Sequence, residues 1–126
     1  PDVIVDGGHN PQCVDALVTA LKPLYPDKKL IFLAGVLADK DWRTMFLRVL
    51  PLAKAFVVVT PDSPRALPAP ELGAWLEEIS QLPVSVQDSL DAGVDAALAQ
   101  AGPDDVVCAW GSLYSVGEIR HHLGLC

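Results

Sequence analysis

The chain has 126 residues, of which 51% are hydrophobic and 20% charged, and its formal net charge is −7. This length suits one domain that buries a core without disulfides or metals, and the composition excludes a disordered chain. The negative charge argues against nucleic acid and anionic membranes as partners, because both attract basic surfaces. No apolar run approaches the roughly 20 residues that span a bilayer, so we expect no membrane segment.

The three cysteines, Cys13, Cys108 and Cys126, are far apart in the sequence. Their odd number and the lack of a C-x-x-C spacing argue against a disulfide framework and a zinc site. A reducing, cytoplasmic location is the better fit. The chain opens with Pro1 and runs straight into a strand-like segment, which we interpret as part of a longer protein.

Short apolar strands alternate with longer helical stretches along the whole chain. In chain order we expect a strand at 3–5, a helix at 11–25, a strand at 30–36, a helix capped by Asp41 and ending at 50, a strand at 56–59, a helix at 70–81, a strand at 84–86, a helix capped by Ser89 and ending at 101, a strand at 106–109, and a helix from 113 or 114 to 123. Strands that are apolar on both faces and joined by helices are typical of parallel sheets covered on both sides. The sequence therefore predicts a doubly wound, mainly parallel α/β sheet with helices on both faces.

Ligands of such sheets bind outside the carboxyl ends of the strands, and the loop after the first predicted strand is the most informative. Gly7 and Gly8 let the backbone approach a ligand closely, and the following helix offers free N–H groups and a positive dipole end. Asp6 can accept hydrogen bonds from a sugar hydroxyl, and His9 can donate to a phosphate or carboxylate. The structural alternative is that Asn10 caps the helix, Asp6 stabilises the turn and His9 is a surface residue. The loop is not G-x-G-x-x-G, which argues against a dinucleotide site.

The last loop, after the strand at 106–109, has the same form. Ser112 follows Gly111 and precedes a predicted helix, so its hydroxyl and the helix N-terminal amides can together bind one carboxylate. The alternative is that Ser112 only caps the helix. A nucleophilic role for Ser112 is disfavoured, because the sequence has no G-x-S-x-G motif. Glu118 and His121 follow Ser112 in the order serine, acid, histidine of a catalytic triad, but they match it only loosely.

Two further loops carry charges whose role the sequence leaves open. Lys40 lies between Asp39 and Asp41, where it either faces a ligand phosphate as a point charge or is solvated. Arg65 lies in a proline-stiffened loop, which suits a guanidinium directed at a carboxylate or a partner domain, although an ordinary surface charge fits as well. No P-loop G-x-x-x-x-G-K-[ST] is present, so the phosphates of ATP would need another protein segment.

Four motifs follow one another at these strand ends: Asp6-Gly7-Gly8-His9-Asn10-Pro11, Gly35-Val36-Leu37-Ala38-Asp39-Lys40-Asp41, Pro64-Arg65-Ala66 and Gly111-Ser112-Leu113-Tyr114-Ser115-Val116-Gly117-Glu118. In this order they resemble the C-terminal domain of folylpolyglutamate synthase and dihydrofolate synthase, in the Mur ligase superfamily. The resemblance covers nearly the whole chain. Gly8 stands where the family usually has alanine and Ser115 where it usually has an aliphatic residue; neither change removes a group that the chemistry needs.

The resemblance implies a single Mur ligase-type C-terminal domain over residues 1–126, without the N-terminal P-loop ATPase domain of the same polypeptide. That domain is the expected partner, and it would bind most of the ATP and Mg²⁺. The implied reaction adds L-glutamate to a folate through an acyl phosphate, and the isolated chain is expected to be inactive.

The resemblance also implies roles for individual residues. His9 would be catalytic and contact the glutamate, and Ser112 would bind the glutamate. Nucleotide contacts would come from Asp6, Gly7, Gly8 and Asn10. Supporting roles would fall to Lys40, Asp41, Arg65 and Tyr114. No residue of this chain is expected to bind a metal.

Three other interpretations remain open. Within the superfamily, the chain could belong to a cell-wall muramyl amino-acid ligase or to a cyanophycin-type ligase. A phosphoacceptor receiver module is also a small doubly wound domain, but Thr60 and Pro61 follow the third predicted strand where a receiver needs aspartate. The last interpretation is a plain protein-interaction domain.

Overall fold

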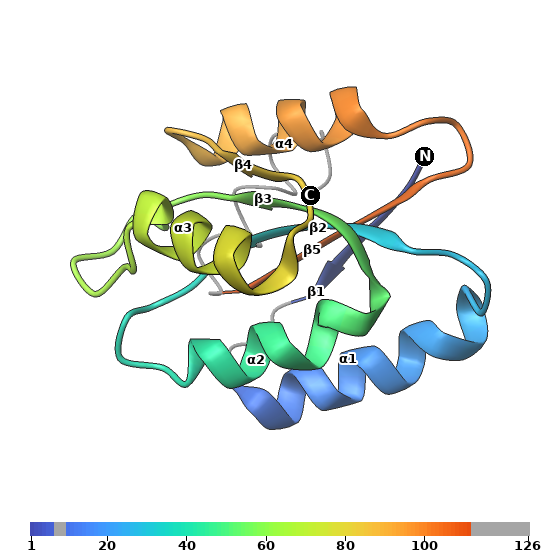
Figure 1. The fold of residues 1–126 in the computed structure, drawn as a ribbon, viewed down its shortest axis with the longest axis horizontal. Helices are drawn as coiled ribbons and strands as arrows, with labels where there is room; N and C mark the ends of the chain where they lie inside the picture. Colours follow the sequence, from blue (N-terminus) through green and yellow to red (C-terminus); the bar gives the residue numbers. More distant parts are fainter. Residues whose placement is uncertain (7–9, 112–126) are drawn as a thin grey trace.

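The computed structural model describes residues 1–6 and 10–111, which form a parallel sheet with helices on both faces (Figure 1). The strands pair in the order β1-β5-β2-β3-β4, and every pair is parallel. The strands are β1 (Asp2–Asp6), β2 (Leu30–Gly35), β3 (Ala53–Val58), β4 (Val84–Val86) and β5 (Val106–Gly111). The helices are α1 (Pro11–Leu24), α2 (Trp42–Val49), α3 (Ala69–Ser80) and α4 (Leu90–Gln100), and a short 3₁₀ helix, η1 (Leu50–Leu52), follows α2. The predicted doubly wound α/β fold is confirmed; the predicted helix at 113–123 lies outside the described residues.

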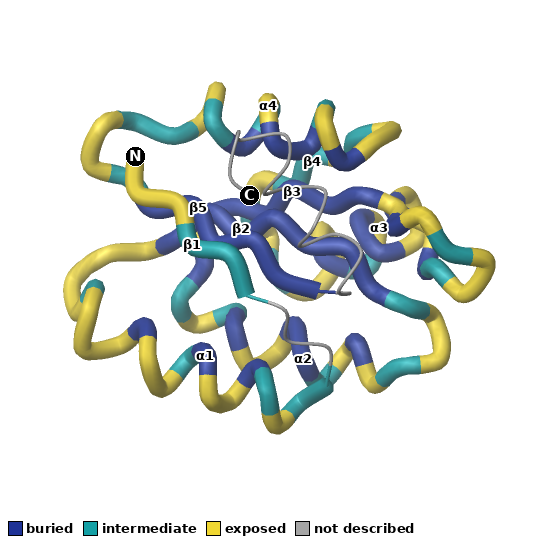
Figure 2. Tube along the Cα trace, turned by 180° about the vertical axis from the view of Figure 1, so that it is seen from behind, coloured by how far each residue is buried: buried dark blue, intermediate teal, exposed yellow. Residues whose placement is uncertain are grey.

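Two apolar layers, one on each side of the sheet, hold the helices in place. In β2, Phe32 faces the layer that α1, α2 and α3 share, while Leu33 faces the layer under α4. This alternation follows from the two-residue period of a strand, and it requires apolar residues at every position of a strand covered on both sides. Figure 2 shows the result: β2 and β5 are buried along their length, whereas the edge strand β1 is exposed or half-buried.

Aromatic rings fill the larger layer. The Phe46 ring of α2 lies 5.9 Å from Phe56 and 4.7 Å from Trp110, between centroids, and Phe32 stacks on Phe56 at 6.0 Å. All four side chains are fully buried. Offset and edge-on aromatic pairs add to the stabilisation that burial itself provides.

Strand β3 begins at Ala53, three residues before the predicted start. Pairing between β2 and β3 is irregular here, because Leu30 is opposite Ala53 whereas Ile31 is opposite Ala55. Lys54 is the extra residue, as in a β-bulge. Its exposed charge interrupts the apolar run, which is why the sequence pattern placed the strand start too late.

The helix starts also differ in part from the prediction. Asn10 and Ser89 cap α1 and α4: their side chains accept from Cys13 N at 2.8 Å and Ala92 N at 3.1 Å. Asp41 occupies the N-cap position of α2, but its side chain makes no capping hydrogen bond, so the prediction that it caps this helix was wrong. Its backbone, at φ −79° and ψ 62°, lies outside the extended conformation that a capping residue normally adopts.

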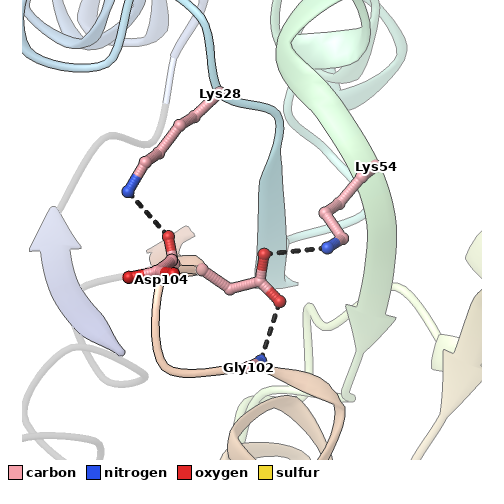
Figure 3. Close-up of polar contacts among 5 residues, drawn as sticks. Lys28, Lys54, Gly102 and Asp104 are labelled. Carbon is pink, nitrogen blue, oxygen red and sulfur yellow. Dashed lines mark hydrogen bonds and ion pairs between the residues drawn. The ribbon is translucent and has the colours of Figure 1, made fainter.

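Hydrogen bonds join the turn between α4 and β5 to Lys28, which precedes β2, and to Lys54, near the start of β3 (Figure 3). One carboxylate oxygen of Asp105 accepts from Lys54 Nζ at 2.8 Å and the other from the Gly102 N–H at 2.8 Å. Lys28 Nζ donates to the Asp104 carbonyl oxygen at 2.7 Å. We call Lys28, Lys54, Gly102, Asp104 and Asp105 the amino-end cluster.

Candidate functional site

Because all strands are parallel, their carboxyl ends meet at one edge of the sheet, opposite the amino-end cluster. Three predicted motifs begin there. Asp6 ends β1 beside Trp110 of β5, and Gly35 at the end of β2 is opposite Gly111 at the end of β5. Residues far apart in the sequence are thus brought together where open α/β sheets bind their ligands.

Asp6 is half-buried at the rim of this edge. Burial and, to a smaller extent, the negative charge of Asp6 together raise the pKa of the Cys108 thiol to about 12. Cys108 therefore stays a neutral thiol inside the larger apolar layer, and it has neither the exposure nor the charge of a nucleophile or a metal ligand. Next to Asp6, Trp110 is buried, and its indole nitrogen has no hydrogen-bond partner among the described residues.

Asn10 has a structural task in this protein. Its side-chain oxygen accepts the Cys13 N–H, and its backbone oxygen accepts the Val14 N–H at 3.1 Å. These bonds fix the start of α1, at the last two residues of the first motif. This is the capping alternative that the sequence left open; the nucleotide contact assigned to Asn10 stays a prediction.

The loops after β2 and β3 are joined to each other, which the sequence did not reveal. Ala38 N donates to the Arg65 carbonyl oxygen at 2.7 Å, and Leu67 N donates to the Val36 carbonyl oxygen at 2.9 Å. Leu37 and Ala66 form an antiparallel bridge between these two bonds. The second and third motifs therefore act as one structural unit.

An ion pair reinforces this unit. Arg65 directs Nε and Nη2 at the same Asp39 oxygen, at 2.9 and 2.6 Å. The hydrogen bond from Arg65 lowers the pKa of the Asp39 carboxyl. The carboxylate partner of Arg65 thus lies in this chain, and Asp39 was missing from the predicted site. The motif that contains Asp39 was visible in the sequence, but its pairing with Arg65 depends on how two loops approach each other.

The other charged loop residues have less defined surroundings. Lys40 is half-buried and its backbone N–H donates to the Leu37 oxygen at 3.2 Å, so it lies in a tight turn. Asp41 is exposed at the start of α2. Both stand on the unit that Arg65 and Asp39 stabilise, and their supporting roles stay predictions.

Thr60 has a structural role that the sequence did not reveal. It follows β3, and its hydroxyl oxygen accepts the N–H of Ala69, the first residue of α3, at 2.9 Å. Pro68, at the N-cap position, makes no side-chain capping bond. Thr60 therefore replaces a local cap and anchors α3 to the strand end from nine residues away.

His9, Gly7, Gly8, Ser112 and Tyr114 lie outside the described residues. The catalytic and glutamate-binding roles assigned to His9 and Ser112 are therefore not tested by geometry. Within residues 1–6 and 10–111, no three His, Cys, Asp or Glu side chains gather in a way that could hold a metal ion. Over the same ranges, no helix is long and apolar enough to cross a membrane.

Residues 1–113 match the family model of the Mur ligase glutamate ligase domain. The chain belongs to this family. It is 35% identical over 124 residues to the folylpolyglutamate synthase of Lacticaseibacillus casei, covering 98% of this chain and 27% of that protein. It is 34% identical over 122 residues to the dihydrofolate synthase/folylpolyglutamate synthase of Haemophilus influenzae, covering 94% of this chain and 28% of that protein.

A solved structure shares the fold. The folylpolyglutamate synthase of Mycobacterium tuberculosis, complexed with ADP and AMPPCP, superposes with a TM-score of 0.87 at 27% identity, over 98% of this chain and 30% of that one. The resemblance found in the four motifs is therefore confirmed. Since the chain spans under a third of each of these proteins, the activity of the whole enzyme is a matter of proposal.

Proposed function

We propose that this chain is the C-terminal domain of an ATP-dependent ligase that adds L-glutamate to a folate. The observation that carries this function is the 35% identity to a folylpolyglutamate synthase along 98% of the chain. The placement of Asp6, Gly35 and Gly111 at one sheet edge supports it, because the motifs shared with that family meet where a ligand would bind.

The reaction has two steps. An oxygen of the folate's terminal carboxylate attacks the terminal phosphorus of ATP, and ADP leaves. The amino nitrogen of glutamate then attacks the acyl carbon, the bond to phosphate breaks, and the nitrogen gives up a proton. Both steps depend mainly on positioning and charge stabilisation.

This chain supplies only part of what the reaction needs. It has no P-loop, and its described residues hold no metal-binding cluster. We therefore assign the triphosphate and Mg²⁺ mainly to an N-terminal P-loop ATPase domain of the same polypeptide. Residues 1–126 form a single domain that completes the cleft, and alone it is inactive.

Within this cleft, Asp6, Gly7, Gly8 and Asn10 contact the nucleotide. His9 lies near the reacting phosphate and the glutamate, and Ser112 binds the glutamate. The unit formed by the loops after β2 and β3 carries Lys40 and Asp41 and is held by Arg65; together with Tyr114 these residues support the site. We place the enzyme in the cytoplasm, since Cys13 and Cys108 are both free thiols.

The test is ATP hydrolysis that depends on both a folate and L-glutamate, measured on this chain joined to its native N-terminal domain. We expect His9→Ala to abolish turnover and Ser112→Ala to raise the KM for glutamate. Ser89→Ala is the matched control, because Ser89 also follows a strand and caps a helix. If Ser112→Ala behaves like Ser89→Ala, with lower stability and an unchanged KM, Ser112 is only a helix cap.

A muramyl precursor serves as the competing acceptor in the same assay. Activity that ignores folate but responds to this precursor would move the protein to the cell-wall branch of the family. Turnover by the isolated 126-residue chain would contradict the division of labour between the two domains.

A further inference from the structure

The end of β5 holds a buried hydrogen-bond donor without an acceptor. Trp110 is 1% exposed, and among the buried side-chain nitrogen and oxygen atoms of residues 1–6 and 10–111 only its Nε1 lacks a hydrogen-bond partner. A buried polar group that stays unpaired is destabilising, so native proteins nearly always satisfy it with a protein group, a ligand or an ordered water molecule. The Trp110 indole N–H therefore needs an acceptor near the carboxyl edge of the sheet.

Asp6 lies beside Trp110 on the next strand. The two residues are register partners in the parallel pair of β1 and β5, so their side chains leave the same face of the sheet, from strands about 4.8 Å apart. That face is the one that α1 and α2 cover (Figure 1), since the Trp110 ring packs against Phe46 of α2. The two side chains therefore start close together, on the same side and at the same height.

The carboxylate of Asp6 is a suitable acceptor. Its negative charge reaches Cys108, two residues before Trp110 on the same face, where it contributes to the raised pKa of the thiol. An ionised carboxylate offers about four acceptor sites, so the interaction that Asp6 makes elsewhere leaves room for another. Asp15 of α1 and Asp41 before α2 are exposed, whereas Asp6 is half-buried.

We propose that Trp110 is a positioning residue for the nucleotide. Its Nε1 donates to a water molecule that in turn donates to the Asp6 carboxylate, and this link holds the carboxylate in the orientation that accepts a ribose hydroxyl. A bridging water fits because Nε1 makes no direct bond to Asp6, and such bridges are nearly as favourable as direct bonds. The inference rests on the proposed function, in which Asp6 contacts the nucleotide.

The test removes the indole N–H in the enzyme that joins this chain to its native N-terminal domain. Trp110→Phe keeps an aromatic ring, and the benzothiophene analogue of tryptophan at position 110 also keeps the shape, because sulfur replaces the N–H. We expect both variants to raise the KM for ATP by about three- to tenfold, the usual loss for one hydrogen bond. The KM for glutamate and kcat should change much less. An unchanged KM for ATP with the analogue would contradict the inference even if Trp110→Phe does not fold.

Trp42→Phe is the matched control. Trp42 is buried in the same apolar layer, where its ring meets Trp75 at 5.1 Å between centroids, away from β1. We expect this variant to lower the melting temperature and to leave the KM for ATP unchanged. An equal rise of this KM in Trp42→Phe would show that loss of any buried indole has the same effect, and it would overturn the positioning role.

A double-mutant cycle and an NMR signal separate positioning from packing. If Trp110 acts through Asp6, adding Trp110→Phe to Asp6→Ala should raise the KM for ATP no further than Asp6→Ala alone, whereas additive effects would refute the link. In ¹⁵N spectra, the indole N–H signal that Trp110→Phe removes should shift in Asp6→Ala, and an unshifted signal would also refute it. A wild-type enzyme without folate- and glutamate-dependent turnover would overturn the proposed function and this inference with it. An active wild type with an unchanged KM for ATP in both Trp110 variants overturns the inference alone.

Discussion

Arg65 and Asp39 show how an exposed pair of charges can join two loops without contributing much to the stability of the fold. Their side chains are 55% and 53% exposed, and ion pairs of this kind add little to folding because water and salt screen them. Their effect is local: they close the gap between two loops whose backbones already share two hydrogen bonds. Lys40 and Asp41 stand on one of these loops.

We therefore expect Arg65→Ala and Asp39→Ala to leave thermal unfolding nearly unchanged but to speed hydrogen exchange at the amides of Ala38 and Leu67. These amides donate the bonds between the loops, and local opening controls their exchange. Hydrogen–deuterium exchange resolved by NMR provides the measurement. Arg48→Ala, which removes an ion pair with Asp15 between α1 and α2, is the matched control. Exchange that stays the same in both loop variants would mean that the backbone bonds alone hold the loops.

At the scale of elements, two helix starts that look alike in the sequence differ in the structure. Ser89 and Asp41 each precede an apolar helical stretch, and both residue types are good caps. Only Ser89 adopts the extended backbone that brings its side-chain oxygen to an amide two or three residues on. Asp41 follows the turn at Lys40, and the constraints of that turn set its backbone instead.

Ser89→Ala should consequently lower the free energy of unfolding by about 1 kcal/mol, the usual contribution of an N-cap. Asp41→Ala should have a smaller effect, because no capping bond is lost. Urea unfolding of the 126-residue chain compares the two variants with the wild type. Equal losses for both would show that Asp41 stabilises α2 in another way, such as through the helix dipole.

For the whole molecule, periodicity predicted the elements and their parallel arrangement, because burial on both faces leaves a continuous apolar run in each strand. The order of the strands in the sheet could not be predicted from this periodicity. Nothing local in 106–111 shows that β5 lies between β1 and β2, since pairing depends on the assembled sheet. That the carboxyl ends of the strands meet at one edge, the candidate site, could be predicted from the parallel arrangement. The partner of Arg65 and the contact between Gly35 and Gly111 could not, because both arise from segments distant in sequence.

The amino-end cluster makes the stability of the fold depend on pH. Hydrogen bonds from Lys54 and from the Gly102 N–H lower the pKa of Asp105 in the folded protein. A lowered folded pKa means that the carboxylate stabilises the fold fully above the ordinary aspartate value of 3.8 and loses this effect as pH falls through the folded value. We expect thermal stability to decline as the pH is lowered below about 5.

Asp105→Asn tests this link, because it keeps the shape of the side chain but cannot titrate. Its melting temperature should be lower than that of the wild type at neutral pH and should fall less steeply in acid. Asp104→Asn is the control, since only the backbone oxygen of Asp104 joins the cluster. A wild-type acid slope that persists unchanged in Asp105→Asn would assign the pH dependence to other carboxylates.

The central place of β5 has a consequence for biosynthesis. β1 is bound to the rest of the sheet through β5, the last described strand in the chain. While a ribosome is still translating residues before 106, β1 and β2 have been made but have no strand to bridge them. The edge that carries Asp6 can therefore be completed only after residues 106–111 have been made, and a nascent chain that stalls before them would expose apolar strand edges to chaperones and to aggregation.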